Sequence, residues 1–142
     1  MKNFQISAAR ASLVLGTFAL LTSSCATKPS ADFMAADVNA SKTLDQSEIN
    51  HFVARQFMTN YDANKDGGVT FAEWQQMRPE ADKKTFAKRD KNSDGKVDAE
   101  EMLSVVAANP TFGRLLETMD TNKDGAVQPA EGANFRKHMD EM

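Results

Sequence analysis

The pattern of the stretch DANKDGGVTFAE (residues 62–73) recurs at two later places, as DKNSDGKVDAEE (residues 90–101) and DTNKDGAVQPAE (residues 120–131). All three stretches follow the pattern D-x-N-x-D-G-x5-E without a departure. This pattern puts oxygen-bearing side chains at alternate positions, a glycine at the sixth position and a glutamate at the twelfth. Three copies in one short chain are not expected by chance. They indicate three binding loops for a cation that prefers oxygen ligands.

The chemistry of calcium explains each position of these loops, which we name loop 2, loop 3 and loop 4. Calcium is a hard cation that takes six to eight oxygen ligands, so a short loop must turn its oxygen atoms inward. The sixth-position glycine makes the bend because it adopts a left-handed backbone without steric cost. The seventh residue offers its backbone carbonyl, and the glutamate offers both carboxylate oxygens. The candidate ligands are Asp62, Asn64, Asp66, Gly68, Thr70 and Glu73; Asp90, Asn92, Asp94, Lys96, Asp98 and Glu101; and Asp120, Asn122, Asp124, Ala126, Gln128 and Glu131.

A weaker copy of the pattern, DVNASKTLDQSE (residues 37–48), comes first in the chain and is named loop 1. Lys42 replaces the glycine at the bend, which costs roughly 1 kcal/mol of backbone strain. Serine at the fifth position is also a poorer ligand than a carboxylate. We therefore expect loop 1 to bind calcium weakly or not at all, which gives three to four Ca²⁺ ions per chain. Its candidate ligands are Asp37, Asn39, Ser41, Thr43, Asp45 and Glu48.

Apolar residues at helical spacing flank each loop and predict amphipathic helices, with Trp74 and Met77 facing inward after loop 2. Residues 33–142 thus resemble a four-EF-hand protein of the calmodulin superfamily, in the style of small bacterial members with tightly spaced hands. The resemblance implies an all-α, compact single domain of helix-loop-helix repeats with short paired strands in the loops. Thirteen of the twenty acidic residues lie on candidate ligand positions, which a merely solvated acidic surface would not produce.

Two arrangements of the loops are compatible with the spacing. One apolar residue lies between the bend and the next helix in each loop and suits a short strand that pairs with a neighbouring loop. These residues are Leu44, Val69, Val97 and Val127. The loops pair either in sequence order, or loop 2 with loop 3 and loop 4 with loop 1. Residues 49–61 contain no proline or glycine and predict one continuous helix that holds loops 1 and 2 apart, which favours the second arrangement. Pro79 and Pro110 are expected to begin new helices.

The first 24 residues differ in composition from the rest of the chain and predict a secretory signal peptide of the lipoprotein type. Lys2 and Arg10 are their only charged residues. Residues 11–21 form an apolar run that is too short to span a bilayer as a helix.

The signal segment ends in LTSSC (residues 21–25), which resembles a bacterial lipobox. We therefore expect lipidation of Cys25, the only cysteine, and a lipidated tether over residues 25–32. This implies an exported protein whose lipid anchor holds it in the bacterial envelope, at the outer membrane facing the periplasm. The alternative is a soluble secreted protein cut after Ala26.

The charge, the motifs and the methionine content of the chain narrow the classes of function that we expect. The formal net charge is −3 and no basic cluster is present, so we expect no nucleic acid partner. No nucleophile–base arrangement or phosphate loop lies outside the calcium loops, so we expect no enzymatic activity. A methionine-lined groove would suit a calcium sensor or adaptor with an unidentified protein partner, although the methionines suit core gap-filling better. The alternative is a calcium buffer or calcium-stabilised structural module without groove opening.

Overall fold

Four helix-loop-helix units follow one another along residues 28–140, the part of the chain that the computed structural model describes. The signal segment and Cys25 lie outside this part. The fold is mainly helical with one small antiparallel sheet, which confirms the expected class. The elements are α1 (Ala31–Ala36), α2 (Gln46–Tyr61), β1 (Gly68–Thr70), α3 (Phe71–Met77), α4 (Lys83–Ala87), β2 (Lys96–Asp98), α5 (Ala99–Ala108), α6 (Pro110–Met119), the 3-10 helix η1 (Glu131–Asn134) and α7 (Phe135–Asp140). None of the helices within residues 28–140 has the length and apolar character that a membrane crossing needs.

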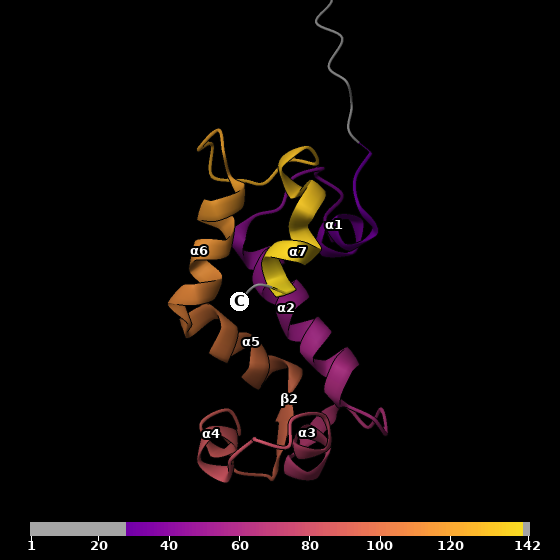
Figure 1. Ribbon diagram of the computed structural model, residues 1–142, viewed down its shortest axis with the longest axis vertical. Helices are drawn as coiled ribbons and strands as arrows, with labels where there is room; N and C mark the ends of the chain where they lie inside the picture. Colours follow the sequence, from indigo (N-terminus) through magenta and orange to yellow (C-terminus); the bar gives the residue numbers. More distant parts are fainter. Residues whose placement is uncertain (1–27, 141–142) are drawn as a thin grey trace, which may run out of the picture.

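The loops pair as 2 with 3 and 1 with 4, which confirms the second arrangement. Strand β1 runs antiparallel to β2, with Val69 opposite Val97. Leu44 of loop 1 and Val127 of loop 4 form an isolated bridge, in which each backbone N–H donates to the other residue's carbonyl at 2.8 Å. The two pairs lie at opposite ends of the molecule, which we call the 1/4 end and the 2/3 end (Figure 1).

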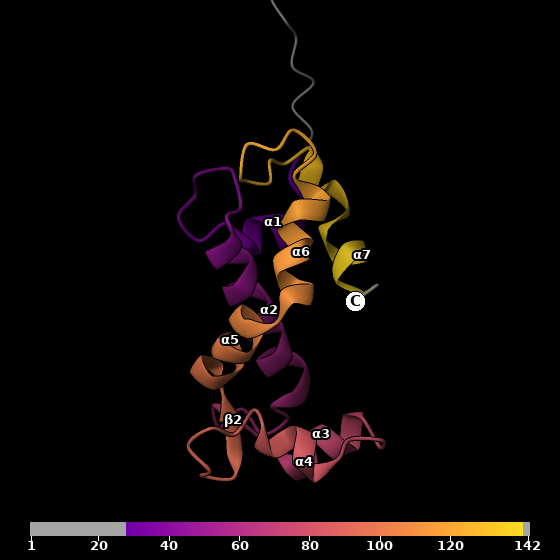
Figure 2. The ribbon, with the colours of Figure 1, turned by 90° about the vertical axis from the view of Figure 1, so that its left-hand side faces the viewer.

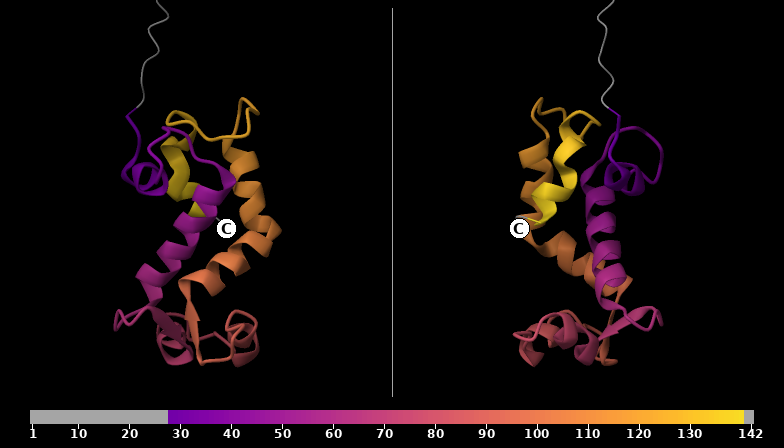
Figure 3. Two further views of the ribbon diagram at one scale, coloured as in Figure 1. Left: turned by 180° about the vertical axis from the view of Figure 1, so that it is seen from behind. Right: turned by 45° about the vertical axis from the view of Figure 1, so that its right-hand side comes forward.

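Helix α2 keeps the two ends apart. It begins with a capping box, in which the Asp45 side chain accepts from the Glu48 backbone N–H (2.8 Å) and Glu48 accepts from that of Asp45 (3.2 Å). Its 16 residues span about 24 Å at 1.5 Å per residue. The chain returns from the 2/3 end to the 1/4 end through α5 and α6. A break at Asn109 and Pro110 separates these two helices, as expected. Helix α2 packs against both, and Figures 2 and 3 show the two paths joining the ends.

One hydrophobic core runs through both ends. The four paired strand residues are fully buried, and the rings of Phe52 and Phe135 lie 5.0 Å apart between α2 and α7. Gly132 permits close packing at the 1/4 end, because a Cβ atom there would lie 2.5 Å from the Phe33 ring. The buried hydrophobic residues are Phe33, Ala36, Leu44, Ile49, Phe52, Val53, Ala54, Val69, Trp74, Phe86, Val97, Met102, Val106, Leu115, Met119, Val127 and Phe135.

Three local expectations are wrong. Pro79 lies in a turn and does not begin a helix; α4 begins at Lys83, where the Asp82 side chain caps it. Met77 does not face inward with Trp74 and is 61% exposed, because α3 ends there. Helix α1 begins at Ala31, so the last two residues of the expected tether belong to the folded domain.

Candidate metal sites

All four loops follow the same backbone path. The sixth position has a left-handed backbone in each loop, with φ of 89° at Gly67, Gly95 and Gly125 and 68° at Lys42. The fourth position is also left-handed, with φ between 56° and 61°. These fourth residues are Ala40, Lys65, Ser93 and Lys123. Loop 1 therefore makes the bend of the complete loops, although it has a side chain where glycine is favoured.

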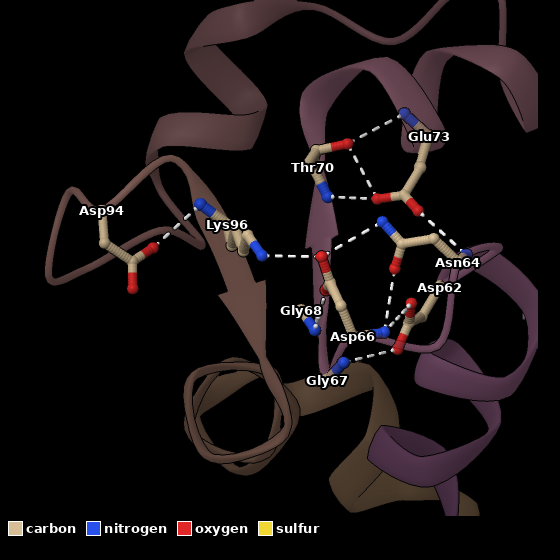
Figure 4. A network of polar contacts seen from close by, with 9 residues as sticks. All are labelled: Asp62, Asn64, Asp66, Gly67, Gly68, Thr70, Glu73, Asp94 and Lys96. Atoms are coloured by element: carbon tan, nitrogen blue, oxygen red, sulfur yellow. Dashed lines mark hydrogen bonds and ion pairs between the residues drawn. The ribbon is translucent and has the colours of Figure 1, made fainter.

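Loop 2 shows how the backbone turns the ligand oxygens inward (Figure 4). Asp62 accepts hydrogen bonds from the backbone N–H groups of Asp66 (3.2 Å) and Gly67 (3.0 Å). The Asn64 side-chain oxygen accepts from the same Asp66 N–H at 2.8 Å, and Asp66 accepts from the Gly68 N–H at 3.1 Å. The donors are successive N–H groups of the bend, so three oxygen-bearing side chains converge on one side of the loop.

The closing glutamate of loop 2 has two structural roles. As the third residue of α3, Glu73 completes a capping box with Thr70, whose backbone N–H donates to Oε2 at 2.9 Å. Its Oε1 reaches across the loop and accepts from the Asn64 N–H at 3.3 Å. Hydrogen bonds from Thr70, first from its backbone and then from its side chain, lower the pKa of Glu73. The carboxylate is therefore held ionised and directed at the candidate site.

Loop 4 repeats this geometry, with Asp120 accepting from the Asp124 and Gly125 N–H groups at 3.1 and 2.8 Å. Glu131 accepts from the Gln128 N–H at 3.0 Å and from the Asn122 N–H at 3.2 Å. The Gln128 backbone bond is the largest cause that lowers the pKa of Glu131.

Loop 3 differs from loops 2 and 4 in one atom. Asp90 Oδ2 accepts from the Gly95 N–H at 3.0 Å, but Asp90 Oδ1 is buried and has no hydrogen-bond partner among the described residues. Glu101 Oε1 accepts from the Lys91 and Asn92 N–H groups at 2.9 and 3.0 Å. A buried carboxylate oxygen without a donor is costly, and a cation in the loop would satisfy it.

Loop 1 has the same outer network but a different interior. Asp37 accepts from the Ser41 and Lys42 N–H groups at 2.9 Å each. The Ser41 hydroxyl donates to the Thr43 backbone carbonyl at 2.9 Å. Two of the candidate ligand oxygens are thus engaged with each other, which gives loop 1 a second weakness besides Lys42.

The donor set fits calcium better than a transition metal. Within residues 28–140, no cluster of three or more His, Cys, Asp or Glu residues is placed to hold a metal by itself. The other expected ligands of loops 2, 3 and 4 include asparagine side chains and the carbonyls of Gly68, Lys96 and Ala126. A set of oxygen donors without imidazole or thiolate is the ligand chemistry that calcium prefers.

An ion pair joins loops 2 and 3, and the sequence reasoning missed it. Lys96, expected only as a carbonyl donor, places its Nζ 2.7 Å from Asp66 Oδ2 (Figure 4). The pair raises the pKa of Lys96 and lowers that of Asp66. Gly68 makes room for it, since a Cβ atom there would lie 2.8 Å from Lys96 Cδ. The glycine at the seventh position of loop 2 is the sequence feature that could have indicated this ion pair, because a side chain there would collide with Lys96.

Comparison with known families agrees with this geometry. The family model described as EF hand matches residues 55–77 and 82–106, which contain loops 2 and 3, helices α3 and α4, and parts of α2 and α5. No curated protein sequence matches the chain. EF hands bind Ca²⁺ through such loops. Residues 55–106 therefore form two tandem EF hands, and calcium is the ligand that they support.

Proposed function

We propose that this protein is a calcium-binding lipoprotein of a bacterial envelope that acts as a non-enzymatic calcium sensor or adaptor. The observation that carries the calcium part is the common geometry of the loops, each with a left-handed bend and a closing glutamate turned across the loop. Loops 2, 3 and 4 would each bind one ion through the ligands named above. Loop 1 would bind a further ion weakly.

The sensor role is supported by the surroundings of loop 2. Glu73 is the closing glutamate, and Trp74, the next residue, is buried against the ring of Phe86 at 5.9 Å. A shift of Glu73 toward an ion would therefore move α3 and the packing around Trp74. The alternative, a buffer or structural module, is supported by Met119, which is buried in the core at 1% exposure.

Calorimetry tests the calcium sites. Titration of the chain from Ala26 onward should find one ion for each of loops 2, 3 and 4, with at most one weaker ion in loop 1. Two ions or fewer would refute the assignment of all three complete loops.

Trp74 fluorescence separates the sensor from the buffer. Calcium should change the emission of Trp74, the only tryptophan, while magnesium should not, because magnesium prefers octahedral sites with several waters. Glu73→Gln should abolish the change, and the matched variant Glu131→Gln, at the opposite end, should retain it. Calcium should also increase the binding of an apolar dye. A fall in dye binding would favour the buffer or structural module.

Cell fractionation tests the anchor. Cys25→Ser should move the protein from the membrane fraction to the soluble periplasmic fraction or leave it unprocessed. A wild-type protein in the soluble fraction would favour cleavage after Ala26.

A further inference from the structure

A cavity of about 350 Å³ opens beside loop pair 2/3, among α2, α3, α5 and α6. Its apolar wall contains the half-buried rings of Phe57, Tyr61 and Phe112, and the buried side chains of Trp74 and Met102. Cavities that bind small molecules or single side chains begin at about this volume. The cavity is therefore large enough to take an apolar group from a ligand.

Two arginines, Arg78 and Arg89, line the same cavity. The Arg89 guanidinium lies over the Trp74 ring at 4.7 Å, and its Nη1 donates to the Thr85 carbonyl at 2.9 Å. Its Nε is buried without an acceptor among the described residues. Arg78 donates to the Tyr61 hydroxyl at 3.0 Å. Neither arginine forms an ion pair with a carboxylate in residues 28–140.

The electrostatics of this wall favour an anion. Burial and then the positive charge of Arg78 lower the pKa of Arg89, and the smaller opposing effects of Asp82 and Tyr61 offset the repulsion between the two guanidinium groups only in part. A carboxylate is a suitable partner, because guanidinium groups bind it in a planar, two-pronged geometry. An anion against the two guanidinium groups would relieve the repulsion.

A second hollow of about 210 Å³ lies next to the first and shares Phe57, Met102 and Phe112 with it. Its other lining residues are Val53 and three polar residues, Gln56, Asn60 and Arg136. Two neighbouring hollows suit a chain with successive apolar side chains better than one compact molecule.

We propose that these hollows bind an acidic peptide segment of a protein partner, with apolar side chains in the two hollows and a carboxylate against Arg78 and Arg89. This inference rests on the proposed adaptor function and gives its partner a chemical class. A basic amphipathic segment would bring further positive charge to the two arginines and is disfavoured.

The test uses a synthetic amphipathic peptide of Leu, Phe, Ala and Glu, without Trp or Tyr, and its isosteric control with Gln in place of every Glu. Binding is followed by Trp74 fluorescence and by calorimetry, in calcium and in chelator. The Glu peptide should bind the wild type, and the Gln peptide should bind about tenfold more weakly or not at all.

Protein variants locate the site. Arg89→Met and Arg78→Met should each weaken binding of the Glu peptide by about tenfold, the effect of losing one charge-assisted hydrogen bond. Arg114→Met, at an exposed position of α6 that lines neither hollow, should not. Circular dichroism should show that Arg89→Met is folded, and the exposed Arg78 provides an independent test.

Equal binding of the Glu and Gln peptides, tighter binding of a Lys version, or no effect of either variant would overturn the inference. So would binding of 4-phenylbutyrate as tight as that of the Glu peptide, because the ligand would then be a small carboxylate. Peptide binding that is the same with and without calcium would preserve this inference and refute the sensor. A calcium response of Trp74 and of dye binding, without any peptide binding, would support the sensor and overturn this inference.

Discussion

Lys42 provides the sharpest test of how loop 1 departs from the other loops. Its φ of 68° is in the left-handed region, where Gly67, Gly95 and Gly125 make the same bend at 89°. Replacing Lys42 by glycine removes the clash of Cβ with the backbone. The backbone hydrogen bond from residue 42 to Asp37 Oδ2, at 2.9 Å, does not depend on the side chain and should remain.

The expected gain is modest. The left-handed backbone costs a residue with a Cβ roughly 1–2 kcal/mol, while glycine increases the entropy of the unfolded chain by about 0.5–1 kcal/mol. We therefore expect Lys42→Gly to raise the free energy of unfolding by about 0.5–1 kcal/mol, or Tm by about 2–6 °C. Lys42→Ala is the matched control, because it removes the charge and keeps the strain. It should have the stability of the wild type.

Urea unfolding in chelator, followed by circular dichroism, measures both variants without contributions from metal binding. If Lys42→Ala stabilises the protein as much as Lys42→Gly, the gain comes from removing a positive charge and the strain argument fails. If Lys42→Gly destabilises the protein, the bend of loop 1 is not strained. In calorimetry, Lys42→Gly should leave loop 1 weaker than the complete loops, because Ser41 still engages the Thr43 carbonyl.

Three further predictions follow from other contacts. Lys96→Met should strengthen calcium binding at loop 2, because Lys96 would no longer compete with the ion for Asp66; the gain should be only about threefold, since an exposed ion pair is weak. Lys88→Met is the control, and an equal change in both variants would exclude a specific effect of the Lys96–Asp66 pair. Gly132→Ala should lower the free energy of unfolding by about 1–3 kcal/mol, whereas Gly113→Ala, which meets open space, should not lower it; equal thermal melts would contradict this packing. Hydrogen bonds from the first turn of α4 lower the pKa of Asp82 below its ordinary 3.8, so their stabilisation is present above that pH and lost as pH falls through the lowered pKa. Acid unfolding profiles of wild type and Asp82→Asn should therefore converge below pH 3.8, and parallel profiles would count against it.

The sequence predicted the positions of the loops and the pairing of their strands. The pairing could be predicted because residues 49–61 have nothing to interrupt a helix, and α2 is long enough to separate loops 1 and 2. The start of α4 was missed because two signals competed. Pro79 can begin a helix, but Asp82 provides a side-chain cap to Thr85 at 2.8 Å, and a turn from Arg78 to Ala81 takes up the proline.

Tertiary contacts account for what the sequence did not predict. Helical spacing puts Met77 one turn beyond Trp74, but spacing alone does not show that α3 ends there and leaves Met77 uncovered. The ion pair between Lys96 and Asp66 depends on the register of β1 and β2, which places distant residues side by side. The cavity depends in the same way on how α2 crosses α5.

Helices α1 and α7 meet at the 1/4 end (Figure 1), which would give a lipid-anchored form of the molecule a direction with respect to the membrane. Asp32 Oδ1 and Arg136 Nη1 lie 4.0 Å apart there, so the described chain begins at this pole, beside the start of α7. A lipid on Cys25 would hold the domain by this pole, with loops 1 and 4 nearest the bilayer. The opposite pole, with loops 2 and 3 and the arginine-lined cavity, would then project away from the bilayer, where it could be reached by a soluble protein.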